Sequence, residues 1–154
     1  MSMSTFERIL VPTDFSPPSD HALEVAINLA RKLGARLVLL HVWSMPYTAY
    51  SEGLNWPMDE MERAAKKELD DLHAKTMKVY PATDAILRAG FEASAILEII
   101  DIHAIDLVVM GTHGRRGLPR LLVGSVAERV VRLSPVPVMT VSAGYEKNRV
   151  ASAP

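Results

Sequence analysis

The segment Ile9-Leu10-Val11-Pro12-Thr13-Asp14-Phe15-Ser16-Pro17-Pro18 joins a short apolar run to the start of a helix. Three consecutive large aliphatic residues that end at a proline are typical of a buried strand. Ser16 followed by two prolines marks a helix start, because proline is tolerated in the first helical turn. One apolar helix face then follows, made of Leu23, Ala26, Ile27, Ala30 and Leu33. Gly34 stands where this helix should end.

The same alternation of strand and helix continues along the chain. Apolar runs predict strands at residues 9–11, 37–42, 85–87, 107–110 and 136–141. Helical periodicity predicts helices at residues 16–33, 58–79, 93–103 and 125–133. Strands that are apolar throughout and separated by helices favour a parallel sheet covered on both faces. We therefore expect an α/β fold with a five-stranded parallel sheet.

Right-handed crossovers leave few possible strand orders for such a sheet, and we expect the order 3-2-1-4-5. In this order the strands that follow the first one are added on one side of it, and the fourth and fifth strands are added on its other side. Ligands of such sheets bind at this switch point, between the first and fourth strands and beyond their carboxyl ends. A chain of 154 residues is the usual size of one domain. We assign that domain to residues 1–143 and a polar tail to residues 144–154.

The composition excludes several classes of function. The formal net charge is −1, from 17 basic and 18 acidic residues, whereas a nucleic-acid-binding domain is usually basic. There is no cysteine, which rules out disulfides and thiolate chemistry. The five histidines show no metal-like spacing with acidic partners, so no metal site built from side chains is expected. With neither a signal segment nor an apolar stretch of membrane-spanning length, we expect a cytoplasmic protein that does not enter membranes.

A glycine pattern follows the fourth predicted strand. Gly111, Gly114 and Gly124 are separated by two and nine residues, and Ser125 follows directly at the start of the last predicted helix. Glycines let a ligand approach the main chain closely, and a helix N-terminus favours phosphate through its free N–H groups and dipole. Arg115 adds positive charge. The alternative is that the glycines are turn residues and that Ser125 is only a helix N-cap.

Two further positions follow strands near the same edge. Asp14 comes just after the first strand, where a carboxylate could accept a hydrogen bond from an adenine amino group or a ribose hydroxyl. The alternative for Asp14 is a turn residue at the helix start. Val42 ends the second strand and could line a base pocket, although a valine in this position is more often a core residue.

These segments together resemble the nucleotide-binding branch of the universal stress protein family. The resemblance covers about residues 6–143 and includes the family's ATP-binding glycine spacing, which is intact here. It rests on Ile9-Leu10-Val11-Pro12-Thr13-Asp14-Phe15-Ser16, Leu40-His41-Val42, Asp106-Leu107-Val108-Val109-Met110-Gly111-Thr112-His113-Gly114, Gly124-Ser125-Val126-Ala127 and Pro135-Val136-Pro137-Val138. It implies a homodimer that binds ATP, with ADP, AMP and cyclic AMP as alternatives, accompanied by Mg²⁺ or Mn²⁺ held through the phosphates.

The resemblance also implies a role for each matching residue. Asp14 and the main chain of Val42 would contact adenine, beside a wall formed by Pro12 and Thr13. The ribose and the phosphates would lie over Met110 and Gly111. The phosphate chain would be held by Gly114, Gly124, Ser125 and the amide of Val126, with His113 and Arg115 on the surrounding loop.

The last predicted strand, from Val136 to Val141, is apolar and uncharged, and the resemblance implies that two copies pair through it. An unprotected edge of this kind favours pairing with another chain. No general base is evident beside the glycine loop other than His113. We therefore expect a nucleotide-dependent stress-response module without a dedicated catalytic activity. A slow ATPase or phosphotransfer protein and a dimeric adaptor that does not use the nucleotide are the alternatives.

Overall fold

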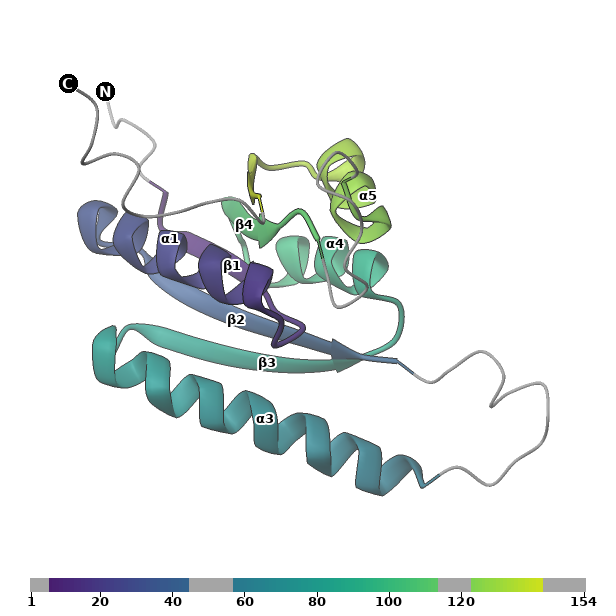
Figure 1. Ribbon diagram of the computed structural model, residues 1–154. Coiled ribbons are helices and arrows are strands. Elements are labelled where there is room, and N and C mark those ends of the chain that lie inside the picture. The colour runs from purple at the N-terminus through teal and green to yellow at the C-terminus, as the bar shows by residue number, and fades with distance from the viewer. Residues whose placement is uncertain (1–5, 45–56, 114–122, 143–154) are drawn as a thin grey trace.

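A computed structural model describes residues 6–44, 57–113 and 123–142. Their elements, in chain order, are β1 (Arg8–Pro12), α1 (Pro17–Leu33), β2 (Arg36–Trp43), α3 (Met58–Val79), β3 (Thr83–Ala89), α4 (Glu92–Ile102), β4 (Leu107–Gly111), α5 (Ser125–Leu133) and β5 (Val138–Val141). The strands form one sheet in the order β3-β2-β1-β4-β5, and every neighbouring pair is parallel. The expected fold class and strand order are therefore confirmed (Figure 1).

The sheet lies between two layers of helices (Figure 1). Side chains alternate between the two faces of a strand, so neighbouring residues of β1 enter different cores. Ile9 and Val11 pack with α1 and α3, whereas Leu10 packs with α4 and α5. All three side chains are fully buried. This explains why the three central residues of β1 are all apolar.

Asp106, directly before β4, fixes the beginning of β1. Its two carboxylate oxygens accept hydrogen bonds from the main-chain N–H groups of Glu7 and Arg8, at 2.8 and 3.1 Å. Charge-assisted bonds of this kind are stronger than neutral ones. The contact joins segments almost a hundred residues apart and sets the position of β1 beside β4.

The two edge strands differ from the sequence prediction. The third strand runs over Thr83–Ala89 instead of 85–87, because it pairs with β2 along its full length. Asp84 contributes to this pairing through a salt bridge to Arg36 on β2, at 2.9 Å. The last strand begins at Val138 instead of Val136. Before it, the Ser134 hydroxyl exchanges hydrogen bonds with the main chain of Val136 and holds a turn.

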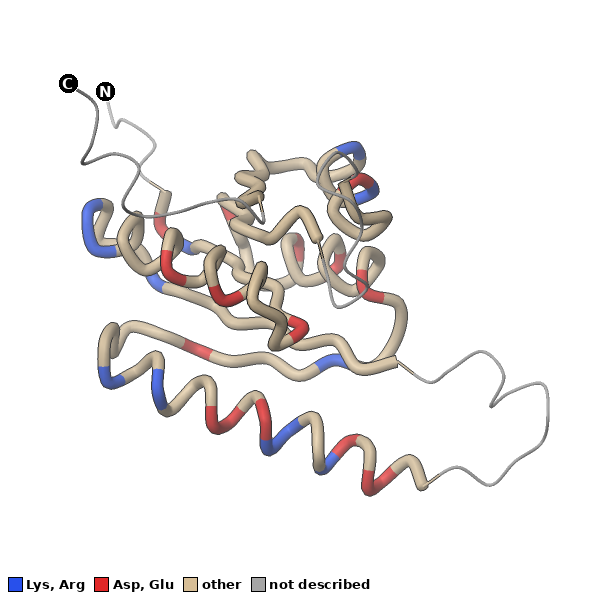
Figure 2. Tube along the Cα trace, in the orientation of Figure 1, with Lys and Arg blue, Asp and Glu red and all other residues tan. Residues whose placement is uncertain are grey.

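The outer face of α3 is solvated. Figure 2 shows acidic and basic residues interspersed along this helix. Two pairs one turn apart form exposed salt bridges, Lys66–Asp70 at 2.6 Å and Lys67–Asp71 at 2.7 Å. Such pairs support a helix only weakly. Among the helices of the described residues, none is both long enough and apolar enough to cross a membrane.

Candidate functional site

The described residues that the sequence singles out lie at the ends of β1, β2 and β4, directly after β1 and β4, or at the start of α5. Parallel strands end at the same edge of a sheet, and β1 lies between β2 and β4. The structure therefore brings the β1–α1 turn, the end of β2 and the end of β4 to one edge. Gly114 and Arg115 lie outside the described residues, as does the predicted tail.

The turn between β1 and α1 is held by its own hydroxyl and carboxyl groups. One oxygen of Asp14 accepts hydrogen bonds from the N–H group of Ser16, at 3.0 Å, and from its hydroxyl. The Thr13 hydroxyl accepts a bond from the N–H group of Phe15 at 3.0 Å and lies 3.2 Å from the hydroxyl of Ser19. Asp14 thus stabilises the turn, which agrees with its interpretation as a turn residue at the helix start. The residue is only partly buried.

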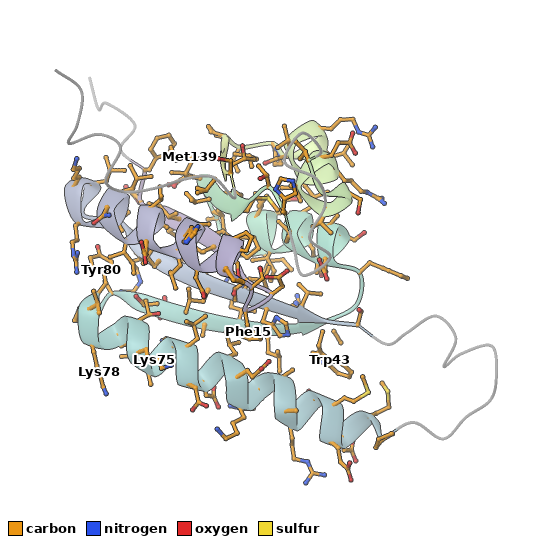
Figure 3. All side chains as sticks on the ribbon, viewed as in Figure 1. Phe15, Trp43, Lys75, Lys78, Tyr80 and Met139 are labelled. Carbon is orange, nitrogen blue, oxygen red and sulfur yellow. The ribbon has the colours of Figure 1, made fainter. Side chains whose placement is uncertain are left out.

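His41 on β2 also contacts this turn, and sequence reasoning had not singled it out. Its Nδ1 lies 2.8 Å from the main-chain oxygen of Thr13. Its ring packs against the ring of Phe15, with centroids 4.4 Å apart. Figure 3 shows Phe15 beside the carboxyl-terminal part of the sheet. The signal in the sequence was a polar residue inside an otherwise apolar strand.

Val42 and Met110 are core residues on the same face of the sheet. They are 8% and 5% exposed, and both belong to the apolar cluster formed with α4 and α5. Their side chains are therefore largely committed to the core. Pro12 is partly buried at the end of β1, next to the buried Thr13.

Two of the glycines lie in close contact with carbonyl groups of the chain. A Cβ atom at Gly111 would lie 3.0 Å from the carbonyl oxygen of Pro18, at the start of α1. A Cβ atom at Gly124 would lie 3.0 Å from the carbonyl oxygen of Thr112. The N–H group of Gly124 donates to that same oxygen at 2.6 Å. The absence of a side chain at Gly124 thus lets the start of α5 close onto the end of β4.

Among the residues that the structure describes, none provides a side-chain cap at the start of α5. Gly124 is the N-cap residue and makes no side-chain hydrogen bond, and Ser125 is the first residue of the helix. The alternative that Ser125 is the N-cap is therefore wrong, because the N-cap lies one residue earlier. Ser125 is exposed, whereas Val126 is partly buried and packs against the core. The first N–H groups of α5 are thus accompanied by an exposed hydroxyl group.

Thr112 connects the end of β4 to two other segments. Its N–H group donates to the carbonyl oxygen of Val141, the last residue of β5, at 3.0 Å, and its carbonyl accepts from Gly124. Its hydroxyl lies 2.9 Å from Nδ1 of His113, and both residues are buried. The sequence had singled out His113 but not Thr112.

Acidic groups gather at the start of α1. Burial raises the pKa of the Asp20 carboxyl above its ordinary value. The neighbouring His21 lowers this pKa, the nearby carboxylates of Asp14 and Glu24 raise it further, and Lys75 on α3 lowers it. Within the part of the chain that the structure describes, no three His, Asp or Glu side chains are grouped so as to hold a metal ion.

The chain is similar to known proteins along most of its length. Residues 5–142 match the family model described as the universal stress protein family. Universal stress protein MJ0531 of Methanocaldococcus jannaschii is 32% identical over 143 residues, which cover 88% of this chain and 82% of that protein. A universal stress protein of Thermus aquaticus is 34% identical over 141 residues, covering 88% of this chain and 98% of that protein. Among solved structures, universal stress protein UspA from Lactobacillus plantarum has a TM-score of 0.76 at 26% identity, covering 90% of this chain and 99% of that one.

Proposed function

The chain belongs to the universal stress protein family, and from this we propose that it binds an adenine nucleotide at the edge formed by the ends of β1, β2 and β4. The nucleotide-bound protein acts as a regulatory module in the response to stress. ATP is the nucleotide we favour, and ADP, AMP and cyclic AMP are the alternatives that the same site would accept.

The observation that carries this proposal is the junction of Gly111, Thr112 and Gly124. It holds the start of α5 against the end of β4, and within the described residues this helix start has no side-chain cap and carries the exposed hydroxyl of Ser125. Unpaired N–H groups and the positive end of the helix dipole favour a phosphate group. A hydroxyl group beside them donates a further hydrogen bond. The phosphates would therefore lie against Gly124, Ser125 and the amide of Val126, with Gly114, His113 and Arg115 on the loop around them.

The base would lie on the other side of this edge. Asp14, whose carboxylate holds the β1–α1 turn through Ser16, lies at the end of β1 where the base would sit. Its carboxylate would accept a hydrogen bond from the adenine amino group, since carboxylate oxygens are hydrogen-bond acceptors. Since the side chain of Val42 is buried, this residue would contribute its main chain, and Pro12 and Thr13 would form the adjacent wall.

Structural neighbours with bound nucleotides agree with this assignment. One universal stress protein of the same fold was solved in complex with cAMP, with a TM-score of 0.60 at 24% identity. Another, from Archaeoglobus fulgidus, was solved in complex with dAMP, with a TM-score of 0.63 at 23% identity. At this level of identity the likeness is one of fold, so the proposal for this chain depends on its own residues.

A divalent ion would be held chiefly by the nucleotide. Mg²⁺ keeps several water ligands and commonly binds through phosphate oxygens. Mg²⁺ or Mn²⁺ should therefore strengthen the binding of ATP more than that of cyclic AMP, which has a single phosphate.

Dimerisation through β5 is the second part of the proposal. This strand ends the sheet, where it pairs with β4 alone among the described strands. Val138 is partly buried, and Met139, labelled in Figure 3, is 39% exposed. Edge strands that are short of charge favour pairing with another chain, and two-fold pairing would satisfy both edges. A Met139→Lys variant should sediment as a monomer. A variant that still sediments as a dimer would show that the interface does not lie at β5.

Equilibrium dialysis with ATP, ADP, AMP and cyclic AMP, with GTP as the control base, tests the nucleotide site. We expect binding below millimolar concentration for at least one adenine nucleotide, and weaker binding of GTP. Removing one charge-assisted hydrogen bond costs about 1.5–3 kcal/mol, so Ser125→Ala should weaken ATP roughly 10-fold to 100-fold. Absence of binding for all four adenine nucleotides would refute the site. Phosphate released in the same samples distinguishes a binding module from a slow ATPase.

A further inference from the structure

His41 is a buried polar residue that joins β2 to the turn after β1. It lies between the apolar residues Leu40 and Val42 of β2 and is 9% exposed. Its Nδ1 is 2.8 Å from the main-chain oxygen of Thr13. A carbonyl oxygen only accepts hydrogen bonds, so Nδ1 carries the hydrogen and donates it. The bond therefore fixes the orientation of the ring.

The ring of His41 also contacts Phe15, the residue directly after Asp14. Phe15 packs against His41 with ring centroids 4.4 Å apart and planes tilted by 42°. Phe15 has a φ angle of +62°, in the left-handed region that non-glycine residues rarely adopt. Such a conformation persists only where its surroundings hold it. His41 thus contacts the residues directly before and after Asp14, one by a hydrogen bond and the other by ring packing.

His41 is also the residue directly before Val42. In the proposed function, the adenine base is contacted by Asp14 from the turn and by the main chain of Val42 from β2. One side chain therefore connects the two segments that would recognise the base. We propose that His41 is a positioning residue for adenine recognition, which sets the distance between the Asp14 turn and the end of β2. This inference rests on the proposed nucleotide site.

The hydrogen bond of His41 makes a specific prediction about substitutions. His41→Leu keeps much of the side-chain volume but removes the donor, so the buried carbonyl of Thr13 loses its side-chain partner. His41→Asn restores an N–H donor at the position of Nδ1. His73 on α3 is a matched control. Its Nε2 lies 2.8 Å from the main-chain oxygen of Thr83 on β3, the same distance as in the contact of His41. His73→Leu removes a comparable bond far along the chain from the Asp14 turn.

The first experiment measures the affinities of the four proteins for ATP, GTP and inorganic tripolyphosphate by titration calorimetry. We expect His41→Leu to weaken ATP about tenfold, the effect of one lost hydrogen bond, and to leave tripolyphosphate unchanged. His41→Asn should recover most of the ATP affinity and the preference over GTP. His73→Leu should retain both, although it lowers stability. Equal weakening of ATP and tripolyphosphate in His41→Leu, or loss of base preference in His73→Leu, would overturn the assignment.

A second measurement separates this inference from the nucleotide site itself. Hydrogen exchange at the amides of Phe15 and Ser16 reports the turn directly, because both donate within it. We expect faster exchange at these amides in His41→Leu, with recovery in His41→Asn. If the unsubstituted protein binds no nucleotide, the proposed function fails and exchange alone decides whether His41 holds the turn. Exchange that is equal in His41→Leu and His73→Leu would show that it does not.

Discussion

Replacing Gly124 with alanine tests whether the start of α5 is pressed against the end of β4. The added Cβ would lie 3.0 Å from the carbonyl oxygen of Thr112, and one of the two would have to give by a few tenths of an ångström. That oxygen already accepts the N–H group of Gly124 at 2.6 Å, so there is little room for it to move. Overpacking of this kind costs about 1–3 kcal/mol. For a chain of this size each kcal/mol lowers Tm by about 2–4 °C.

We therefore expect Gly124→Ala to lower Tm by roughly 2–12 °C in a thermal melt followed by circular dichroism. The control is Val123→Ala, the neighbouring residue, whose side chain is 50% exposed and whose truncation should change stability by less than about 0.5 kcal/mol. The same movement would shift the N–H groups at the start of α5, so ATP binding should weaken in Gly124→Ala alone. A Tm within about 1 °C of the unsubstituted protein, with unchanged affinity, would refute this close contact as a constraint.

Three further substitutions test the core, the start of β1 and the first turn of α1. Leu10→Ala removes a fully buried side chain and should lower the free energy of unfolding in urea by about 2–5 kcal/mol, with a smaller loss counting against tight packing there. Asp106→Ala leaves the N–H groups of Glu7 and Arg8 without their carboxylate and should cost about 1.5–3 kcal/mol in the same assay, whereas an unchanged midpoint would mean that water replaces it. The pKa of Asp20 is raised in the folded protein, so its charge opposes folding above that pKa and this effect disappears below the ordinary value of 3.8. Asp20→Asn should therefore gain stability relative to the unsubstituted protein near pH 7 and lose this advantage below pH 3.8, and a difference that is constant with pH would contradict the assignment.

The sequence predicted those parts of the fold whose signals are local. Residues 58–79 and 125–133 were predicted as helices, and α3 and α5 have these bounds. Gly34 was predicted to end the first helix, and it does so with φ of +69°. The third strand was predicted too short, because Thr83 and Asp84 are polar and owe their place in the sheet to pairing with β2. Pairing of this kind depends on a partner more than forty residues away, which no local pattern records.

The candidate site was predictable in its position but not in its internal contacts. Parallel topology alone places Asp14, Val42 and Gly111 at one edge, once the strand order is known. The role of Gly111 in admitting Pro18 depends on how closely α1 approaches β4, which a single sequence does not specify. The contact of His41 with the β1–α1 turn could not be predicted either. Its partner is a main-chain carbonyl, and a carbonyl has no signature in the sequence.

Thr112 has a consequence for any ligand that contacts α5. Its main chain bonds at once to Gly124, at the start of this helix, and to Val141, at the end of the edge strand β5. A ligand that altered both bonds would couple its own binding to the end of β5, and such coupling is reciprocal by thermodynamic linkage. If a nucleotide at the start of α5 tightens pairing at β5 by some factor, pairing at β5 must tighten the nucleotide by the same factor. Nucleotide affinity would then depend on protein concentration, and the proportion of dimer would report the level of the nucleotide.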